Sequence, residues 1–282
     1  MLSIDPKQFE ATYIYKILTS SVAPRPIALV SSYNKAEQNN LAPFSFFNVF
    51  GFNPPIIGFS PTCRGRDGSF KDTYNNLVQS KECVVNIVNH SMQYQMNLAS
   101  GEYDTNIDEF NKSGFTPVDS QCVKAKRVQE SPVQMECKLK QVIDLGGQKG
   151  SGNLILCEVV RFHLNKDYLD ENNVPDPIKI NHIGRNGGEY YTHVNSDSLY
   201  TLKVKKGCLG IGFDALPAFI RNSTILTGNE LGQLASVQER PQNKLDLKID
   251  NLTLDNCHET IANAIANNDI DLAWRIINEL DQ

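Results

Sequence analysis

The sequence predicts a mainly β protein, in which an antiparallel sheet closes into a barrel and the helices pack outside it. About seven strand-like segments lie between residues 27 and 194, with only about three short helices among them. Most of these strands follow one another without a long helical crossover, which a parallel sheet would need. The pattern therefore favours a β-barrel with peripheral helices over a doubly wound fold.

The predicted strands are short apolar runs that end in polar residues. The sequence places them at residues 27–32, 41–50, 56–60, 82–88, 134–143 and 154–164, and two further segments, 178–183 and 190–194, close the region. Pro54 and Pro55 precede the third run, and proline, which cannot donate to a ladder, belongs at the start of a strand.

Four segments of this region have helical character. Residues 5–17 form a short arm or helix, and residues 90–100 place apolar side chains at helical spacing. Asp72 or Thr73 is a good N-cap for a helix that runs to about Ser80. The segment 108–113 is a short helix, and Gly114 follows where a left-handed glycine commonly ends a helix.

The character of the chain changes after residue 195, so we expect two domains, 1–195 and 196–282. Residues 199–212 are strand-like, 215–234 are mixed, and 238–244 form a polar linker. Residues 254–280 then predict a helical hairpin, with Asn267 and Asn268 at the turn and Asp269 capping the second helix. The C-terminal part is therefore expected to be a mixed or helical extension.

Composition excludes several classes of function. The net charge of −5 gives no electrostatic reason to expect nucleic-acid binding, and no apolar run is long enough to span a membrane. The seven cysteines are scattered without a C-x-x-C pair, and the N-terminus has no apolar signal segment, so a cytoplasmic location is expected. The five histidines form no recognisable metal set or hydrolytic triad.

One group of residues suits a phosphate. Arg64, Arg66, Ser69, Lys71 and Thr73 combine cations with hydroxyls, and Lys71 and Thr73 lie where a helix begins. A helix N-terminus offers unpaired N–H groups and a favourable dipole to an anion. A solvated loop followed by an ordinary helix cap explains the same residues, and spacing alone does not decide between the two.

A second group suits a planar ring. Asn40, Ser45 and Asn48 interrupt the apolar strand 41–50, and alternation places Leu41, Pro43 and Ser45 on one face. Pro43 removes one ladder N–H, which leaves a neighbouring backbone group available to a ligand. An edge strand with a bulge is at least as good an explanation of these residues.

The third group surrounds Arg185, which is followed by glycines and two tyrosines in the stretch 184–191. Its guanidinium could lie over a ring or a phosphate, although such a stretch is more often a turn into a strand. The glycine-rich segment 146–152 lacks the P-loop pattern, and no strand–G-x-G-x-x-G–helix unit occurs, so neither a P-loop nor a Rossmann site is predicted.

Several ordered motifs make the chain resemble a known family. Arg25-Pro26-Ile27-Ala28, Asn40-Leu41-Ala42-Pro43-Phe44-Ser45, Asn53-Pro54-Pro55, Lys71-Asp72-Thr73 and Val84-Val85-Asn86 occur in this order. Together they resemble the flavoredoxin and flavin reductase-like family over about residues 10–195, whereas the region after 195 resembles nothing in that family. The resemblance implies an FMN-binding split β-barrel and a homodimer with FMN near the subunit interface.

The resemblance also implies a set of cofactor-binding residues. Asn40, Leu41, Ala42, Pro43, Phe44 and Ser45 would line the isoalloxazine; Ser60, Lys71, Asp72 and Thr73 would hold the phosphate; and Arg25 and Asn86 would support the pocket. Arg64, Arg66 and Arg185 are added to the set because of their charge. No catalytic or metal-binding residue is predicted.

The expected function is that of an FMN-binding oxidoreductase, either an NAD(P)H-linked flavin reductase or a flavoredoxin, with hydride transfer supplied by the cofactor. Two alternatives stay open. The protein could be a flavin-bound electron carrier for a protein partner without nicotinamide turnover, or a split barrel that binds a ligand other than flavin.

Overall fold

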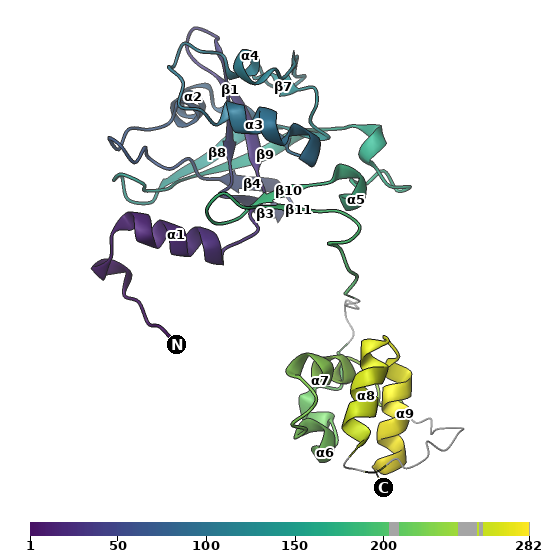
Figure 1. The fold of residues 1–282 in the computed structure, drawn as a ribbon. Coiled ribbons are helices and arrows are strands. Elements are labelled where there is room, and N and C mark those ends of the chain that lie inside the picture. Colours follow the sequence, from purple (N-terminus) through teal and green to yellow (C-terminus); the bar gives the residue numbers. More distant parts are fainter. Residues whose placement is uncertain (203–208, 242–252, 254–255, 282) are drawn as a thin grey trace. The chain divides into compact units, whose positions relative to one another are not determined.

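The computed structural model describes residues 1–202, 209–241, 253 and 256–281. The chain divides into two compact units, Met1–Tyr200 and Thr201–Gln282 (Figure 1). Each unit has its own apolar core.

The first unit is built on one seven-stranded antiparallel sheet. Its spatial order is β2-β1-β5-β8-β9-β4-β3. The strands are β1 (Ala28–Tyr33), β2 (Asn39–Phe44), β3 (Phe47–Phe52), β4 (Pro55–Phe59), β5 (Glu82–Ile87), β8 (Val133–Asp144) and β9 (Asn153–Leu164). All neighbours pair antiparallel, so the mainly β prediction is confirmed.

The two edges of this sheet meet at Ser45 and Phe46. Strand β2 pairs with β1 as far as Phe44, and β3 pairs with β4 from Phe47 onward, at the opposite edge. Only two residues join the edges, so the sheet must curl into a barrel that is split at this point. The prediction of one strand over 41–50 is therefore wrong, because alternation along the chain does not reveal that the pairing partner changes.

The two faces of the sheet carry different cores. The barrel interior contains, among others, Ala28, Val30, Phe44, Phe59, Cys83, Val85, Cys137 and Cys157. The outer face of β1 and β2 packs against helices through Leu29, Leu41, Met92, Met96, Ala99 and Phe110. Strand β2 is thus buried on both sides, with Leu41 facing the helices and Phe44 facing the barrel interior.

Three helices converge on β2: α2 (Asp72–Ser80), α3 (Gln93–Ala99) and α4 (Glu109–Ser113). Helix α2 has Lys71 as its N-cap, one residue before the predicted cap. Helix α3 is preceded by the 3-10 turn η2 (His90–Met92). Helix α4 ends at Gly114, whose φ of 70° confirms the expected left-handed stop.

The remaining elements of this unit are short. They are η1 (Pro6–Gln8), α1 (Ala11–Ser21), β6 (Pro117–Val118), β7 (Arg127–Val128), η3 (Lys166–Tyr168), α5 (Pro177–Ile180), β10 (Ile183–Arg185) and β11 (Tyr191–His193). The predicted strand 178–183 is wrong, because Asp176 caps α5 by accepting bonds from Ile178 N and Lys179 N. Proline at the first helical position supports the same start.

The second unit is helical. It contains η4 (Phe213–Ala215), α6 (Ala218–Arg221), α7 (Gly228–Ala235), α8 (Cys257–Ala266) and α9 (Ile270–Leu280). The predicted hairpin of two helices is confirmed, and Asp269 Oδ1 accepts from Leu272 N at 2.9 Å as its cap. Trp274 is fully buried and donates its indole N–H to Leu234 O at 3.2 Å.

Some predicted segments of the second unit fall partly outside the described residues. Residues 199–202 and 209–212 form no strand, and 203–208 of that predicted strand are not described. Residues 242–244 of the predicted linker and the predicted helix start at 254 also lie outside the described residues. None of the described helices is long and apolar enough to cross a membrane.

Candidate functional site

A cleft of about 540 Å³, its open mouth included, lies where α2, α3 and α4 meet β2. We call it the inner cavity. It is lined by Asn40, Ala42, Pro43, Arg64, Lys71, Asp72, Thr73, Ala99, Ser100, Gly101, Glu102, Tyr103 and Glu109. Seven of the residues predicted to bind a cofactor between positions 40 and 73 therefore meet in one cleft, together with the 99–103 loop and Glu109, which no prediction included.

Lys71 brings positive charge into this cavity. Its ammonium lies 5.7 Å from the centroid of the Phe44 ring, and no ion pair or hydrogen bond joins it to any other described residue. Burial lowers the pKa of Lys71, and the charge of Arg64 lowers it further, whereas Glu102 opposes the shift. A cation desolvated in this way gains most from an anionic partner.

The first turn of α2 adds backbone donors beside Lys71. The N–H groups of Asp72, Thr73 and Tyr74 have no acceptor within the helix, as in any α-helix, and no side chain caps them. Together with Lys71 and the helix dipole, they form a donor set that suits a phosphate. Asp72 can contribute to such a set only through its backbone, because its carboxylate accepts and would repel an anion.

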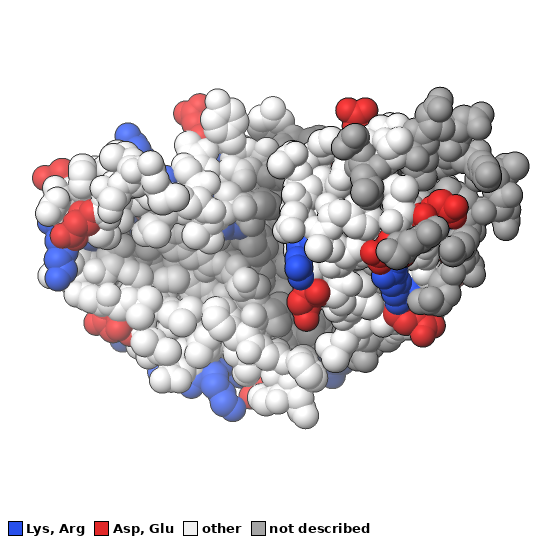
Figure 2. Space-filling model, turned by 90° about the horizontal axis from the view of Figure 1, so that it is seen from below, with Lys and Arg blue, Asp and Glu red and all other residues white. Residues whose placement is uncertain are grey.

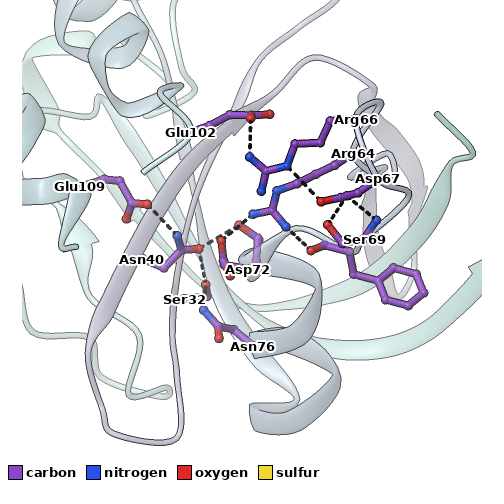
Figure 3. Close-up of polar contacts among 12 residues, drawn as sticks. Ser32, Asn40, Arg64, Arg66, Asp67, Ser69, Asp72, Asn76, Glu102 and Glu109 are labelled. Carbon is purple, nitrogen blue, oxygen red and sulfur yellow. Dashed lines mark hydrogen bonds and ion pairs between the residues drawn. The ribbon is translucent and has the colours of Figure 1, made fainter. Parts of the chain in front are cut away.

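Arg64 lines the cavity but is already paired. Its Nη2 donates to Asp72 Oδ2 at 2.8 Å, and its Nη1 donates to Phe70 O (Figure 3). Arg66, in contrast, does not line the cavity. Its side chain is 63% exposed and pairs with Asp67 at 3.0 Å and with Glu102 at 3.4 Å.

Asn40 is the centre of a buried polar network rather than an open ligand group (Figure 3). Its Oδ1 accepts hydrogen bonds from the hydroxyls of Ser32 at 3.1 Å and Thr73 at 2.9 Å. Its amide donates to Glu109 Oε1 at 3.1 Å, while Leu41 N donates to Glu109 Oε2 at 2.9 Å. The network joins β1, β2, α2 and α4, and so holds the first turn of α2 against the sheet.

Glu109 is the residue of this network that sequence reasoning missed as a site residue. Burial raises its pKa, and the hydrogen bonds from Leu41 and Asn40 oppose the shift. The sequence predicts residues 108–113 only as a short helix. The contact between Glu109 and Asn40 joins positions 69 residues apart, which no local pattern reveals.

Two more cavities continue from the inner one. The middle cavity, of about 500 Å³ with its mouth, is lined by Ile27, Pro43, Ser45, Met96, Asn97, Ser100, Arg185 and Tyr191. The outer cavity, of about 890 Å³, is lined by Gln93, Tyr94, Met96, Asn97, Arg185, Glu189 and Tyr191. The inner and middle cavities share Pro43 and Ser100, and the middle and outer share Met96, Asn97, Arg185 and Tyr191.

The other predicted site residues lie away from these cavities and hold the fold together. The Arg25 guanidinium donates to the carbonyls of Thr19, Val22 and Asn186 and so closes the end of α1. Asn86 is fully buried and bridges Leu29 O and Val128 N. Ser60 Oγ accepts from Asn153 N at 3.0 Å. Leu41 and Phe44 are buried in the two cores, so only their backbone can face a ligand.

The cavities together form one site with three regions of different chemistry. The inner cavity has cations and helix N–H groups, the middle cavity has apolar side chains beside the interrupted edge of β2, and the outer cavity has tyrosines and Arg185. Among the described residues, no group of three His, Cys, Asp or Glu side chains is placed to hold a metal ion. The fold and site thus define a split-barrel protein with a place for a flat ligand that carries an anionic tail.

Comparison with known proteins places the chain in a family. Residues 20–182 match the model of the flavin reductase like domain, so the chain belongs to the flavin reductase-like family and is a flavin-related oxidoreductase or electron-transfer protein. An uncharacterized protein of Aquifex aeolicus is 37% identical over 185 residues, which are 66% of this chain and 92% of that one. The match covers the first unit and not the second.

Solved structures give the same result. The structure of nitrilotriacetate monooxygenase component B from Bacillus cereus is similar with a TM-score of 0.67 and 32% identity, covering 72% of this chain and 98% of that one. The 2-nitrobenzoate 2-nitroreductase of Pseudomonas fluorescens has a TM-score of 0.65 and 28% identity, covering 75% and 100%. The flavoredoxin of Desulfovibrio vulgaris, at 20% identity and a TM-score of 0.56, shares the fold.

Proposed function

We propose that the protein is an FMN-binding oxidoreductase that takes electrons from reduced nicotinamide and passes them to a flavin or a further acceptor. The observation that carries the proposal is the ammonium of Lys71, which no described residue pairs, beside the open first turn of α2 at one end of a continuous site. Membership of the flavin reductase-like family supports the choice of ligand.

In this proposal the phosphate of FMN binds in the inner cavity. Lys71 supplies charge, and the N–H groups of the first α2 turn supply directed donors. Arg64 is neutralised by Asp72, and this ion pair fixes the loop before α2. Thr73 acts through Asn40, because its hydroxyl donates to that amide at 2.9 Å and so fixes the helix turn.

The ring of FMN lies in the middle cavity, against Pro43 and Ser45. Pro43 presents an apolar surface without an N–H group, and the chain at Ser45 leaves the β1 ladder, which frees backbone groups for the polar edge of a ring. Bound FMN supplies the hydride chemistry. The protein residues bind and orient the ring and limit its contact with water, and no side chain acts as an acid or base in this proposal.

The proposal has a direct test in the absorbance spectrum of the purified protein with FMN, before and after addition of NADH or NADPH. Bleaching of the flavin bands, with continuing nicotinamide oxidation when free flavin is present, supports the reductase. Tight FMN binding without nicotinamide oxidation identifies an electron carrier for a protein partner. A flavin spectrum that stays that of free FMN throughout the titration overturns the proposal.

We further propose that the protein is a homodimer. Strand β3 is an edge strand whose apolar side chains face solvent, including Val49, Phe50 and Phe52, the last of which is 93% exposed. An apolar edge of this kind favours association with another chain. A second copy of this chain is the partner that fits this edge, because the split between β2 and β3 then lies beside the subunit contact.

The cytoplasm is the proposed location, since five of the six described cysteines are buried thiols and none is in a disulfide. On the face drawn in Figure 2, the described Lys and Arg side chains are interspersed with Asp and Glu, so this face offers no basic surface for a nucleic acid. The flavin site is proposed to lie wholly within residues 1–195, with 196–282 as an extension.

A further inference from the structure

Arg185 differs from the other arginines near the site because its guanidinium has no polar partner in the part of the chain that the structure describes. It lies over the Tyr191 ring, 4.6 Å from the centroid, and no ion pair or hydrogen bond joins it to any other described residue. Glu189 lines the same outer cavity, yet it forms no ion pair with Arg185 within the described residues. The positive charge of Arg185 is therefore available to a ligand.

The backbone of Arg185 is held firmly, so this charge has a defined place. Arg185 N donates to Arg25 O at 2.8 Å, and Arg25 N donates to Arg185 O at 2.9 Å. On its other side Arg185 pairs with Tyr191 in the β10–β11 hairpin. Arg25 adds positive charge nearby: burial lowers the pKa of Arg25 and the charge of Arg185 lowers it further, whereas Tyr15 opposes the shift. A preorganised cation of this kind favours an anion.

The position of Arg185 excludes the FMN phosphate as its partner. Arg185 lines the middle and outer cavities but not the inner cavity, where Lys71 and the α2 N-terminus lie. The outer cavity also carries surfaces for a second flat molecule, namely Tyr94, Tyr191 and Met96, and amide groups on Gln93 and Asn97. It opens directly onto the middle cavity through the residues that the two share.

We propose that Arg185 recognises the anionic group of the second substrate, a planar π-system that carries a negative charge and binds in the outer cavity. This inference rests on the proposed function and names the substrate class of the same site. Two sources supply such chemistry: the phosphates of a reduced nicotinamide dinucleotide, or the carboxylate of an aromatic electron acceptor. A guanidinium stacked on a tyrosine can take either one.

The test compares benzoate with benzamide, which has the same shape without the charge, by titration of the oxidised FMN-loaded protein and the flavin difference spectrum. The wild type should bind benzoate about 10-fold tighter or more, since a charged partner strengthens the bond. Arg185→Gln should remove this preference and leave benzamide unchanged. Arg161→Gln, an exposed arginine outside all three cavities, should keep it.

A second experiment distinguishes the two sources of the anionic group, a nicotinamide dinucleotide and an aromatic carboxylate. If the substrate is a nicotinamide dinucleotide, Arg185→Gln raises the KM for NADH or NADPH about 10-fold or more with little change in kcat. If it is an aromatic carboxylate, only benzoate binding weakens. If neither changes, the proposal is overturned. A lower flavin midpoint potential in Arg185→Gln, with benzoate preference intact, would instead assign Arg185 to the flavin ring.

The anion site can also be tested if the proposed function is wrong. If the protein binds no FMN, benzoate and benzamide are titrated into the flavin-free protein by calorimetry, with Arg185→Gln and Arg161→Gln as before. A benzoate preference that depends on Arg185 then supports the anion site on its own, and equal binding of the two compounds by the wild type overturns it.

Discussion

The guanidinium of Arg64 lies 2.8 Å from the carboxylate of Asp72, at the first residue of α2. This ion pair neutralises one of the two cations that line the inner cavity. The adjacent Lys71 keeps its charge without an ion-pair partner among the described residues. Arg64 and Asp72 thus shape the loop before α2, whereas Lys71 is left to bind an anion.

The first prediction concerns the pH dependence of FMN binding. The pKa of Lys71 is lowered from 10.5 by burial and by Arg64, so its charge is lost at a lower pH than that of an exposed lysine. FMN affinity should therefore fall as the pH rises toward 10, and the fall should begin below 10.5. Lys71→Arg should keep its affinity over this range, because a guanidinium stays charged.

The measurement is the FMN dissociation constant between about pH 7 and pH 10 for the two proteins by fluorescence titration. Any titration of FMN itself is common to both, so the difference between the curves reports Lys71. Parallel curves for wild type and Lys71→Arg would remove Lys71 from the phosphate site.

The second prediction concerns the buried network around Asn40. Asn40→Asp replaces the amide that donates to Glu109 Oε1 with a carboxylate, so two acids then lie in contact. We expect a loss of about 2 kcal/mol or more in the free energy of unfolding at pH 7. The folded-state pKa of the acid pair is raised above its unfolded value, so the deficit should shrink as the pH falls toward 5.

Urea denaturation at pH 8 and pH 5 measures this change. Asn34→Asp provides the control, because Asn34 lies in an exposed turn and its Oδ1, which accepts from Ala36 N and Gln38 N, is kept in the variant. A deficit in Asn40→Asp that is equal at the two pH values would show that Asn40 and Glu109 are not coupled.

The third prediction tests the proposed dimer. Phe52→Glu changes a side chain that is 93% exposed in one chain, so it should cost a monomer less than about 0.5 kcal/mol. In a dimer that uses β3, the same change buries a charge at the contact and should halve the mass seen by sedimentation velocity. Ile178→Glu, on exposed α5, should leave the mass unchanged. A Phe52→Glu protein of unaltered mass would speak against β3 as the contact.

The fourth prediction separates the two units. Trp274 is the single tryptophan of the chain and is fully buried in the second unit. Trp274→Ala should cost about 3–5 kcal/mol, which is most of the stability of so small a unit. Helical circular dichroism should fall while FMN affinity stays within about twofold. Leu29→Ala, in the barrel, should instead weaken FMN binding. If Trp274→Ala lost as much FMN affinity as Leu29→Ala, FMN binding would not be independent of the second unit.

Local chemistry made part of this structure predictable. The helix start near Lys71 could be predicted from cap preferences. The cations beside it could be recognised as a candidate anion site because of the helix dipole. Both effects act within a few residues. The stop at Gly114 and the cap at Asp269 follow in the same way. The strand pattern predicted the barrel, and the family motifs between residues 25 and 86 added its split form.

Contacts between distant residues could not be predicted. The break at Ser45 depends on which strand lies opposite, and Glu109 meets Asn40 across 69 residues. Arg66 was predicted to bind the cofactor with Arg64, because it has the same charge and lies two positions further along the chain. Its ion pairs with Asp67 and Glu102 instead hold it at the surface, outside the inner cavity. Arg25 and Asn86 belong to the family motifs, yet Arg25 bonds carbonyls at the end of α1, and Asn86 bonds backbone groups of β1 and β7.

The central claim is that the inner cavity binds the phosphate of a flavin mononucleotide, and the sharpest measurement compares FMN with riboflavin in calorimetric titrations of wild type and Lys71→Ala. We predict that the wild type binds FMN about 10- to 100-fold tighter than riboflavin, and that Lys71→Ala loses most of this difference while its riboflavin affinity is unchanged. Equal affinity of the wild type for the two flavins would contradict the central claim.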